Sequence, residues 1–177
     1  EDDERLRSRL VVWNLATGEQ VTSFNTTSRA AWFDWGPAAN KIAVMQSTAN
    51  ELMAYELAVY EPFNNGVGVT LNVLSDVKVV SWKHQDKIAY IKDDSSDKLA
   101  FVKPDGSDKV ETDIVVGFPF SYVKDSNYLY STKDGIKRVD ISTNPIAEDQ
   151  LYTYSLDSYE AAAISFDGQK AILTKKD

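Results

Sequence analysis

The chain has 177 residues, of which 43% are hydrophobic and 26% are charged, a composition typical of one folded globular domain. Its formal net charge of −8 argues against a nucleic-acid partner, because phosphate binding needs clustered lysine and arginine. The absence of cysteine excludes disulfides and thiolate ligands, and no apolar run is long enough to insert directly into a membrane.

The first residues and the cellular location allow more than one interpretation. Residues 1–9 are charged and lack an apolar stripe, so they are expected to form a leader or a linker. Because the sequence starts at Glu1 without a methionine, we expect it to be a portion of a longer protein. The lack of cysteine fits the bacterial periplasm or cell envelope, but it also fits the cytoplasm.

The rest of the chain, residues 10–177, predicts an all-β domain of short antiparallel strands. Residues 10–26 form a hairpin in this interpretation, since β-branched and aromatic residues flank the turn at 16–19. Three units of four strands follow, at about 29–75, 76–116 and 117–156, and residues 159–177 hold two more strands. The second unit is the clearest, because turn signals separate its strands and leave no room for a helix.

A repeat runs through these units. A short apolar strand ends on an aromatic residue, a polar turn follows, and a second apolar strand begins after it. The aromatic positions are Trp35, Trp82, Tyr122 and Phe166, which are 47, 40 and 44 residues apart. A period near 40 to 45 residues with four strands per unit is typical of the blades of a β-propeller.

The order of the half units is compatible with two kinds of propeller ring. The chain starts with the last two strands of a blade and finishes with the first two, as in propellers whose termini share a blade. Three complete blades and one shared blade would make a four-bladed ring. Alternatively, the chain is one part of a larger propeller.

Short motifs carry a resemblance to known propeller families. The stretch 166–172, Phe-Asp-Gly-Gln-Lys-Ala-Ile, together with residues 102–107, resembles the repeats of TolB-like propellers, which have a Ser-Pro-Asp-Gly turn before a Lys-Ile-Ala strand. Residues 10–18 resemble the third strand and turn of a WD repeat. Asn14 replaces the aspartate of the Trp-Asp pair and no Gly-His dipeptide precedes a unit, so the His-Asp relay of WD repeats is not expected. The resemblance implies a propeller and leaves the subfamily open.

No catalytic, cofactor-binding or metal-binding residue is predicted. His84, the only histidine, lies in a predicted tight turn, and no Gly-x-Ser-x-Gly motif accompanies it, so we interpret it as a surface turn residue. The alternating oxygen groups of Asp93, Ser95 and Asp97 suggest a calcium loop. They lack the glycine and the distal glutamate of an EF-hand, so a solvated loop is the better interpretation.

Other candidate sites receive a similar structural interpretation. The turn at 105–108, Asp-Gly-Ser-Asp, is expected to be solvated rather than to bind metal. Residues 25–27, Asn-Thr-Thr, match a glycosylation sequon that matters only in a secreted eukaryotic protein. Six aromatic residues are expected to be buried between blades rather than to bind a ligand: Trp32, Trp35, Trp82, Phe101, Tyr122 and Phe166. The many acidic residues single out no carboxylate pair for glycoside hydrolysis.

The functional prediction is a non-catalytic scaffold that binds a protein or peptide partner and needs no cofactor. The complete strand pattern without a coherent catalytic set favours it. The alternative is a sensory or substrate-gating portion of a longer protein, such as an envelope regulator or the propeller of a serine peptidase, associated with the remainder of that chain. An independent hydrolase is the least favoured interpretation.

Overall fold

The computed structural model describes residues 7–48, 54–71, 77–92, 96–116, 120–123, 127–131, 135–153, 159–165 and 167–175. Within these ranges every regular element is a β-strand, and all pairs of neighbouring strands are antiparallel. The described part of 77–116, where a helix would have contradicted the predicted repeat, contains four strands and no helix.

The strands form three four-stranded sheets flanked by two hairpins. The first hairpin pairs β1 (Arg9–Asn14) with β2 (Glu19–Asn25), and the last pairs β15 (Tyr159–Ile164) with β16 (Ala171–Lys175). The sheets between them are β3 (Ala30–Trp35), β4 (Ile42–Ser47), β5 (Tyr55–Glu61) and β6 (Val67–Leu71); β7 (Val77–Ser81), β8 (Ile88–Lys92), β9 (Lys98–Val102) and β10 (Val110–Val115); and β11 (Phe120–Tyr122), β12 (Tyr128–Ser131), β13 (Gly135–Asp140) and β14 (Ala147–Thr153).

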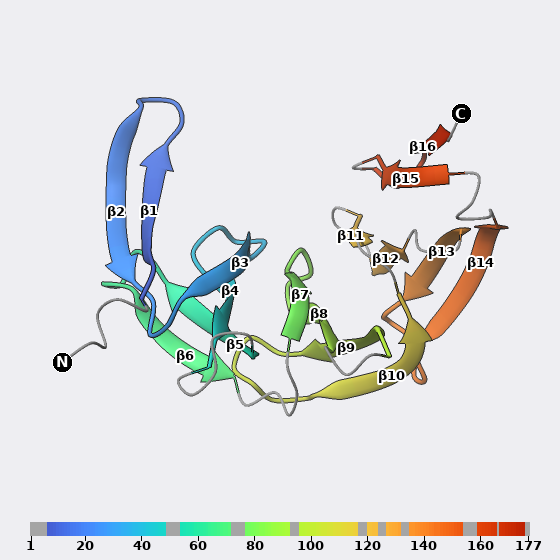
Figure 1. Cartoon of the computed structure of the whole chain (residues 1–177), viewed down its shortest axis with the longest axis horizontal. Coiled ribbons are helices and arrows are strands. Elements are labelled where there is room, and N and C mark those ends of the chain that lie inside the picture. The colour runs from blue at the N-terminus through green and yellow to red at the C-terminus, as the bar shows by residue number, and fades with distance from the viewer. Residues whose placement is uncertain are drawn as a thin grey trace.

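The sheets follow one another along an open arc (Figure 1). The first strand of each complete sheet, β3, β7 or β11, lies on the inner side of the arc. The last strand, β6, β10 or β14, lies on the outer side. The blue hairpin β1–β2 and the red hairpin β15–β16 stand at opposite ends of the arc.

The two hairpins are separate two-stranded sheets and do not pair with each other. The four-bladed ring, one of the two closures that the sequence allowed, is therefore not formed in this structure. The arc agrees with the other alternative, in which the chain is part of a larger ring.

Apolar side chains that alternate along the strands fill the spaces between neighbouring sheets. On β4, Ala43 and Met45 belong to a core cluster shared with Val80, Trp82 and other residues of the β7–β10 sheet. The intervening residues of β4, at positions 42 and 44, pack with Phe24 and Leu10 of the first hairpin. Both faces of β4 are buried, and all six of its residues are buried as a result.

A polar network joins the β2–β3 connection to the first complete sheet. The Tyr60 hydroxyl donates to Oε1 of Gln46 at 2.6 Å and accepts a hydrogen bond from the backbone N–H of Thr27 at 2.9 Å. Gln46 Nε2 donates to Glu56 at 2.8 Å, and the hydroxyls of Ser28 and Ser47 are 2.7 Å apart. The buried polar groups of this core are therefore paired with one another, as desolvated polar groups require.

Candidate functional site

Turns from three neighbouring sheets enclose a cavity of about 710 Å³ on one face of the arc. The β3–β4 turn (residues 36–41) and the β7–β8 turn (residues 82–87) supply most of its lining, Pro104 comes from the β9–β10 turn, and Asn127 immediately precedes β12. We call this surface the turn face. Gly36 allows a close approach where the two principal turns meet, because a Cβ atom there would lie 3.1 Å from the indole ring of Trp82, tighter than most Cβ contacts.

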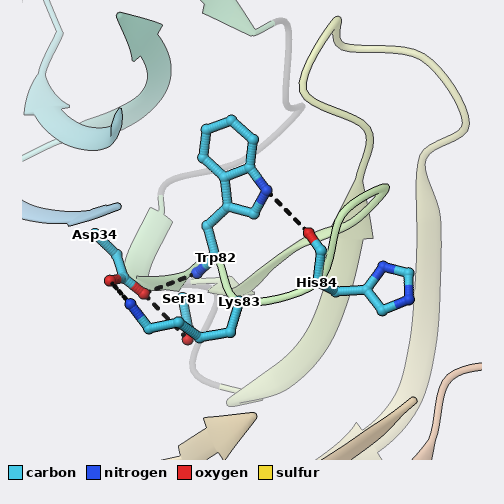
Figure 2. Close-up of polar contacts among 5 residues, drawn as sticks. All are labelled: Asp34, Ser81, Trp82, Lys83 and His84. Carbon is cyan, nitrogen blue, oxygen red and sulfur yellow. Dashed lines mark hydrogen bonds and ion pairs between the residues drawn. The ribbon is translucent and has the colours of Figure 1, made fainter. Parts of the chain in front are cut away.

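Asp34, the second-to-last residue of β3, links the first sheet to the start of the β7–β8 turn (Figure 2). Its Oδ2 accepts a hydrogen bond from the backbone N–H of Trp82 at 2.9 Å and one from Ser81 Oγ at 3.4 Å. Its Oδ1 is paired with the ammonium group of Lys83. One partly buried carboxylate on the first sheet thus binds three consecutive residues, 81 to 83, of the second. Because the acceptor is charged, these hydrogen bonds are stronger than bonds between neutral groups.

His84 belongs to the same turn, and its hydrogen bonds indicate its tautomer. Nδ1 accepts a hydrogen bond from the backbone N–H of Asp86 at 3.1 Å, so the ring proton is assigned to Nε2. Nε2 then donates to Oδ1 of Asn127, 3.2 Å away on the third sheet. The indole N–H of Trp82 donates to the backbone carbonyl of His84 at 3.1 Å, which fixes the turn that carries the ring.

A second cavity of about 600 Å³ adjoins the first and shares Lys41, Gln85, Asp86 and Pro104 with it. Its walls include exposed valines of β6, at positions 67 and 69. Side chains of both charges line both cavities, so neither cavity has charges of one sign only.

Two lysines that line the second cavity, Lys41 and Lys103, form ion pairs. Lys41 Nζ lies 2.8 Å from Glu61, and hydrogen bonds from Lys41 and Asn64 lower the pKa of the Glu61 carboxyl. The ion pair with Asp108 raises the pKa of the Lys103 ammonium. The lysines described around the two cavities, Lys41, Lys83 and Lys103, each face a carboxylate, so these side chains do not offer the unneutralised positive charge that phosphate groups require.

The structure describes some of the predicted acidic candidates and shows their partners. Asp97 pairs with Lys78 at 2.9 Å, whereas Asp93 and Ser95 lie outside the described residues. In the turn at 105–108, Asp105 accepts hydrogen bonds from the backbone N–H and hydroxyl of Ser107, which lower the pKa of its carboxyl. In the described part of the chain, no three histidine, cysteine, aspartate or glutamate residues cluster as a metal site would need.

The asparagine of the sequon is exposed, whereas its third residue, Thr27, takes part in the hydrogen-bond network of the core. Asn25 is the exposed last residue of β2, and Thr26 is buried. The hydroxyl of Thr27 lies 3.1 Å from the Tyr60 hydroxyl and accepts from Gln46 at 2.5 Å. Thr27 therefore contributes to the core network whether or not Asn25 is modified.

The predicted burial of the aromatic residues is confirmed for some and wrong for one. Trp82 and Phe101 are buried between sheets. Trp35 is half-buried and stacks against Phe63, with 6.3 Å between the two ring centroids. Trp32 is instead 44% exposed, because the preceding hairpin has only two strands. The side chains of residues 122 and 166 lie outside the described part.

Asp34 was missed by the sequence analysis, although a signal for it exists. In the repeat, the residue before each anchoring aromatic is Asp34, Ser81, Ser121 or Ser165. A charged residue at a position otherwise occupied by serine, within an apolar strand, indicates a specific partner, since an isolated buried charge is costly. The partner itself is 48 residues away and could not be inferred locally.

The chain is similar to known proteins in its structure and not in its sequence. No protein-family model matches the sequence, and neither does any curated protein. The β-propeller domain of Cps50 (Swd1) from Myceliophteria thermophila superposes with a TM-score of 0.60 over 96% of this chain, at 12% sequence identity. The fold is a β-propeller. Each four-stranded sheet is accordingly a blade, and the two hairpins are half-blades.

A second solved structure, the uncharacterized protein lmo1340 from Listeria monocytogenes EGD-e, matches with a TM-score of 0.54 and 14% identity over 84% of this chain. The present chain spans 56% of the Cps50 domain and 44% of the Listeria protein, about half the length of each. No helix in the described ranges is long and apolar enough to cross a membrane.

Proposed function

We propose that this chain is a non-catalytic propeller scaffold that binds a protein or peptide segment on the turn face. The cavity of about 710 Å³ between the turns of three blades carries this proposal. Its volume is within the range of about 300–1,000 Å³ that is usual for specific binding sites. A rigid stack of sheets holds the turns, so little ordering is needed when a partner binds.

The chemistry of the cavity fits a polypeptide. Pro37, Ala38 and Pro104 provide apolar contact area, and the paired lysines and carboxylates around them provide a polar rim. Apolar patches with polar rims are the usual composition of protein interfaces. The acidic net charge of −8 and the neutralised lysines support a polypeptide over a nucleic acid.

A catalytic role has less support from the same residues. The only histidine of the chain, His84, uses its two ring nitrogens for Asp86 and Asn127. A hydrolase of the serine type needs a histidine that accepts a proton from a hydroxyl nucleophile. His84 is engaged with its own turn through Asp86 and with a neighbouring blade through Asn127, which supports a positioning role within the turn face.

The proposal is tested by selecting binders from a random peptide display library with the 177-residue protein. Ala38→Arg places a long cation in the cavity from an exposed position and should weaken the selected peptides about tenfold or more. Val115→Arg, on the outer strand β10, is the matched control and should leave binding unchanged. If no peptide is selected, or if the selected peptides bind both variants equally, the proposal is wrong.

A further inference from the structure

The second cavity, of about 600 Å³, lies between two complete blades and has an apolar wall. Val67 and Val69 on the outer strand β6 line this cavity and are 54% and 57% exposed. Because they are two positions apart on one strand, their side chains lie on the same face of the sheet. Pro104, from the β9–β10 turn of the next blade, lines the same cavity. The cavity therefore offers apolar contact area to a ligand.

Carboxylates outnumber cations where the next blade borders this cavity. Asp86 and Asp105 line the cavity and are exposed, and in the described part of the chain neither forms an ion pair. The side-chain hydrogen bond with Asp108 is the main cause that raises the pKa of the Lys103 ammonium. The charges of Asp105 and Asp86 raise this pKa further, so both carboxylates lie close to the same cation. One lysine thus serves three carboxylates, which leaves negative charge in excess beside the apolar wall.

The two unpaired carboxylates are held in place by their own turns. Asp105 accepts hydrogen bonds from the backbone N–H and the hydroxyl of Ser107, at 2.9 Å and 2.7 Å, and these bonds favour its ionised form. The backbone N–H of Asp86 is bonded to the His84 ring at 3.1 Å, which fixes the backbone of that turn. Groups that are already positioned lose little conformational entropy when a ligand binds. Both carboxylates are therefore suited to accept hydrogen bonds from a cationic ligand.

The next pair of blades forms an equivalent cavity without this excess charge. A third cavity, of about 580 Å³, is lined by β10 and by the turn between β13 and β14. Lys87 lines it at the position that Lys41 has in the second cavity, since each directly precedes the second strand of its blade. The carboxylates that line the third cavity, Glu111 and Asp113, are paired with lysines at 3.0 Å and 2.7 Å. Unpaired carboxylates among the lining residues therefore distinguish the second cavity from the third.

We propose that the polypeptide bound at the turn face carries a lysine or arginine beside an aliphatic side chain. The cation lies between Asp86 and Asp105, and the aliphatic group packs on the two exposed valines of β6. Excess negative charge adjoins apolar area in this cavity, so a cation with an apolar neighbour complements both. This inference rests on the proposed function, because it specifies the chemistry of the polypeptide that the same face binds.

Two peptide display libraries of equal length test this chemistry with the 177-residue protein. One library lacks lysine and arginine, and the other lacks aspartate and glutamate. The best sequences from each are compared as acetylated synthetic peptides, and those that retain cations should bind about tenfold more tightly or better. A smaller difference would overturn this inference and leave the proposed function standing. No binder from either library would overturn both.

Carboxylate-to-amide variants locate the cation of the selected peptide. Asp86→Asn and Asp105→Asn should each weaken its binding about tenfold, because each removes a charged acceptor at an exposed position. Asp113→Asn is the matched control: it changes a 97% exposed carboxylate of the third cavity and should leave the affinity unchanged. Equal effects of the three variants would overturn the inference.

A double-mutant cycle separates direct contact from a change in the shape of the turn. Replacing the cation of the peptide by norleucine should abolish the effects of Asp86→Asn and Asp105→Asn, because the lost partner is then absent from both sides. Val69→Lys, at an exposed position of the apolar wall, should weaken the cationic peptide about tenfold by covering the wall and repelling the cation. Effects of the amide variants that persist with the norleucine peptide, or an unchanged affinity of Val69→Lys, would overturn the placement of the ligand.

Discussion

The backbone N–H of Trp82 donates a 2.9 Å hydrogen bond to the carboxylate of Asp34, which lies on the preceding blade. The same carboxylate also bonds Ser81 and Lys83. This contact joins two blades at the edge of the cavity of about 710 Å³ on the turn face, so it couples the stability of the propeller to the geometry of the candidate site.

Asp34→Ala should destabilise the protein by about 1–3 kcal/mol, because it leaves the N–H of Trp82 without its acceptor. Urea denaturation measures the loss. Asp113→Ala is the matched control, since Asp113 is 97% exposed in its ion pair with Lys98, and exposed pairs contribute about 0–1 kcal/mol. Equal effects of the two substitutions would show that Asp34 does not join the blades.

Tyr60→Phe should also cost about 1–3 kcal/mol, because it removes the hydroxyl that satisfies both Gln46 and the N–H of Thr27. The Tyr60 ring is 1% exposed, so water cannot replace the lost partner without rearrangement. Thermal unfolding followed by near-ultraviolet circular dichroism measures the change. A variant as stable as the natural protein would contradict the role of this network.

Gly68→Ala tests the packing between β5 and β6. A Cβ atom at Gly68 would lie 2.2 Å from the ring of its cross-strand partner Tyr60, so the buried ring must move, at a cost of about 3 kcal/mol. Gly18→Ala is the control: no atom lies within 4 Å of its added Cβ, and only the backbone angle φ of +72° opposes the change, at about 1 kcal/mol. Chemical denaturation should therefore rank Gly68→Ala as the more damaging variant.

Tyr90 should make the protein sensitive to alkali. Burial, with a smaller contribution from the negative charge of Glu111, raises the pKa of Tyr90 to about 12. Because the unfolded tyrosine has a pKa of about 10, the neutral side chain stabilises the folded state below that pH. This contribution is lost as the pH rises from about 10 through about 12.

The measurement is the free energy of unfolding of the natural protein and of Tyr90→Phe between neutral and alkaline pH. Phenylalanine cannot ionise, so the natural protein should lose stability relative to the variant as the pH rises through this interval. A constant difference between the two proteins would contradict the raised pKa of Tyr90.

Much of the fold could be predicted from local patterns, and less of the candidate site could. The turn that contains His84 was predicted from sequence, and so was the burial of Trp82 between sheets. The bond between His84 and Asn127 and the role of Asp34 were not predicted, because each joins residues more than 40 positions apart. Such contacts depend on how neighbouring blades stack, which no short window of sequence records.

The sequence by itself determined the strands, the turns between them and the propeller repeat, because strand alternation and turn chemistry act over only a few residues. The tertiary structure alone decided which side chains are covered. Trp35 and Trp82 occupy the same position of the repeat, yet Trp35 is only half-buried whereas Trp82 is 4% exposed. A complete blade packs before Trp82 and only half a blade precedes Trp35. Burial is thus a property of the neighbouring sheet and not of the residue's own strand.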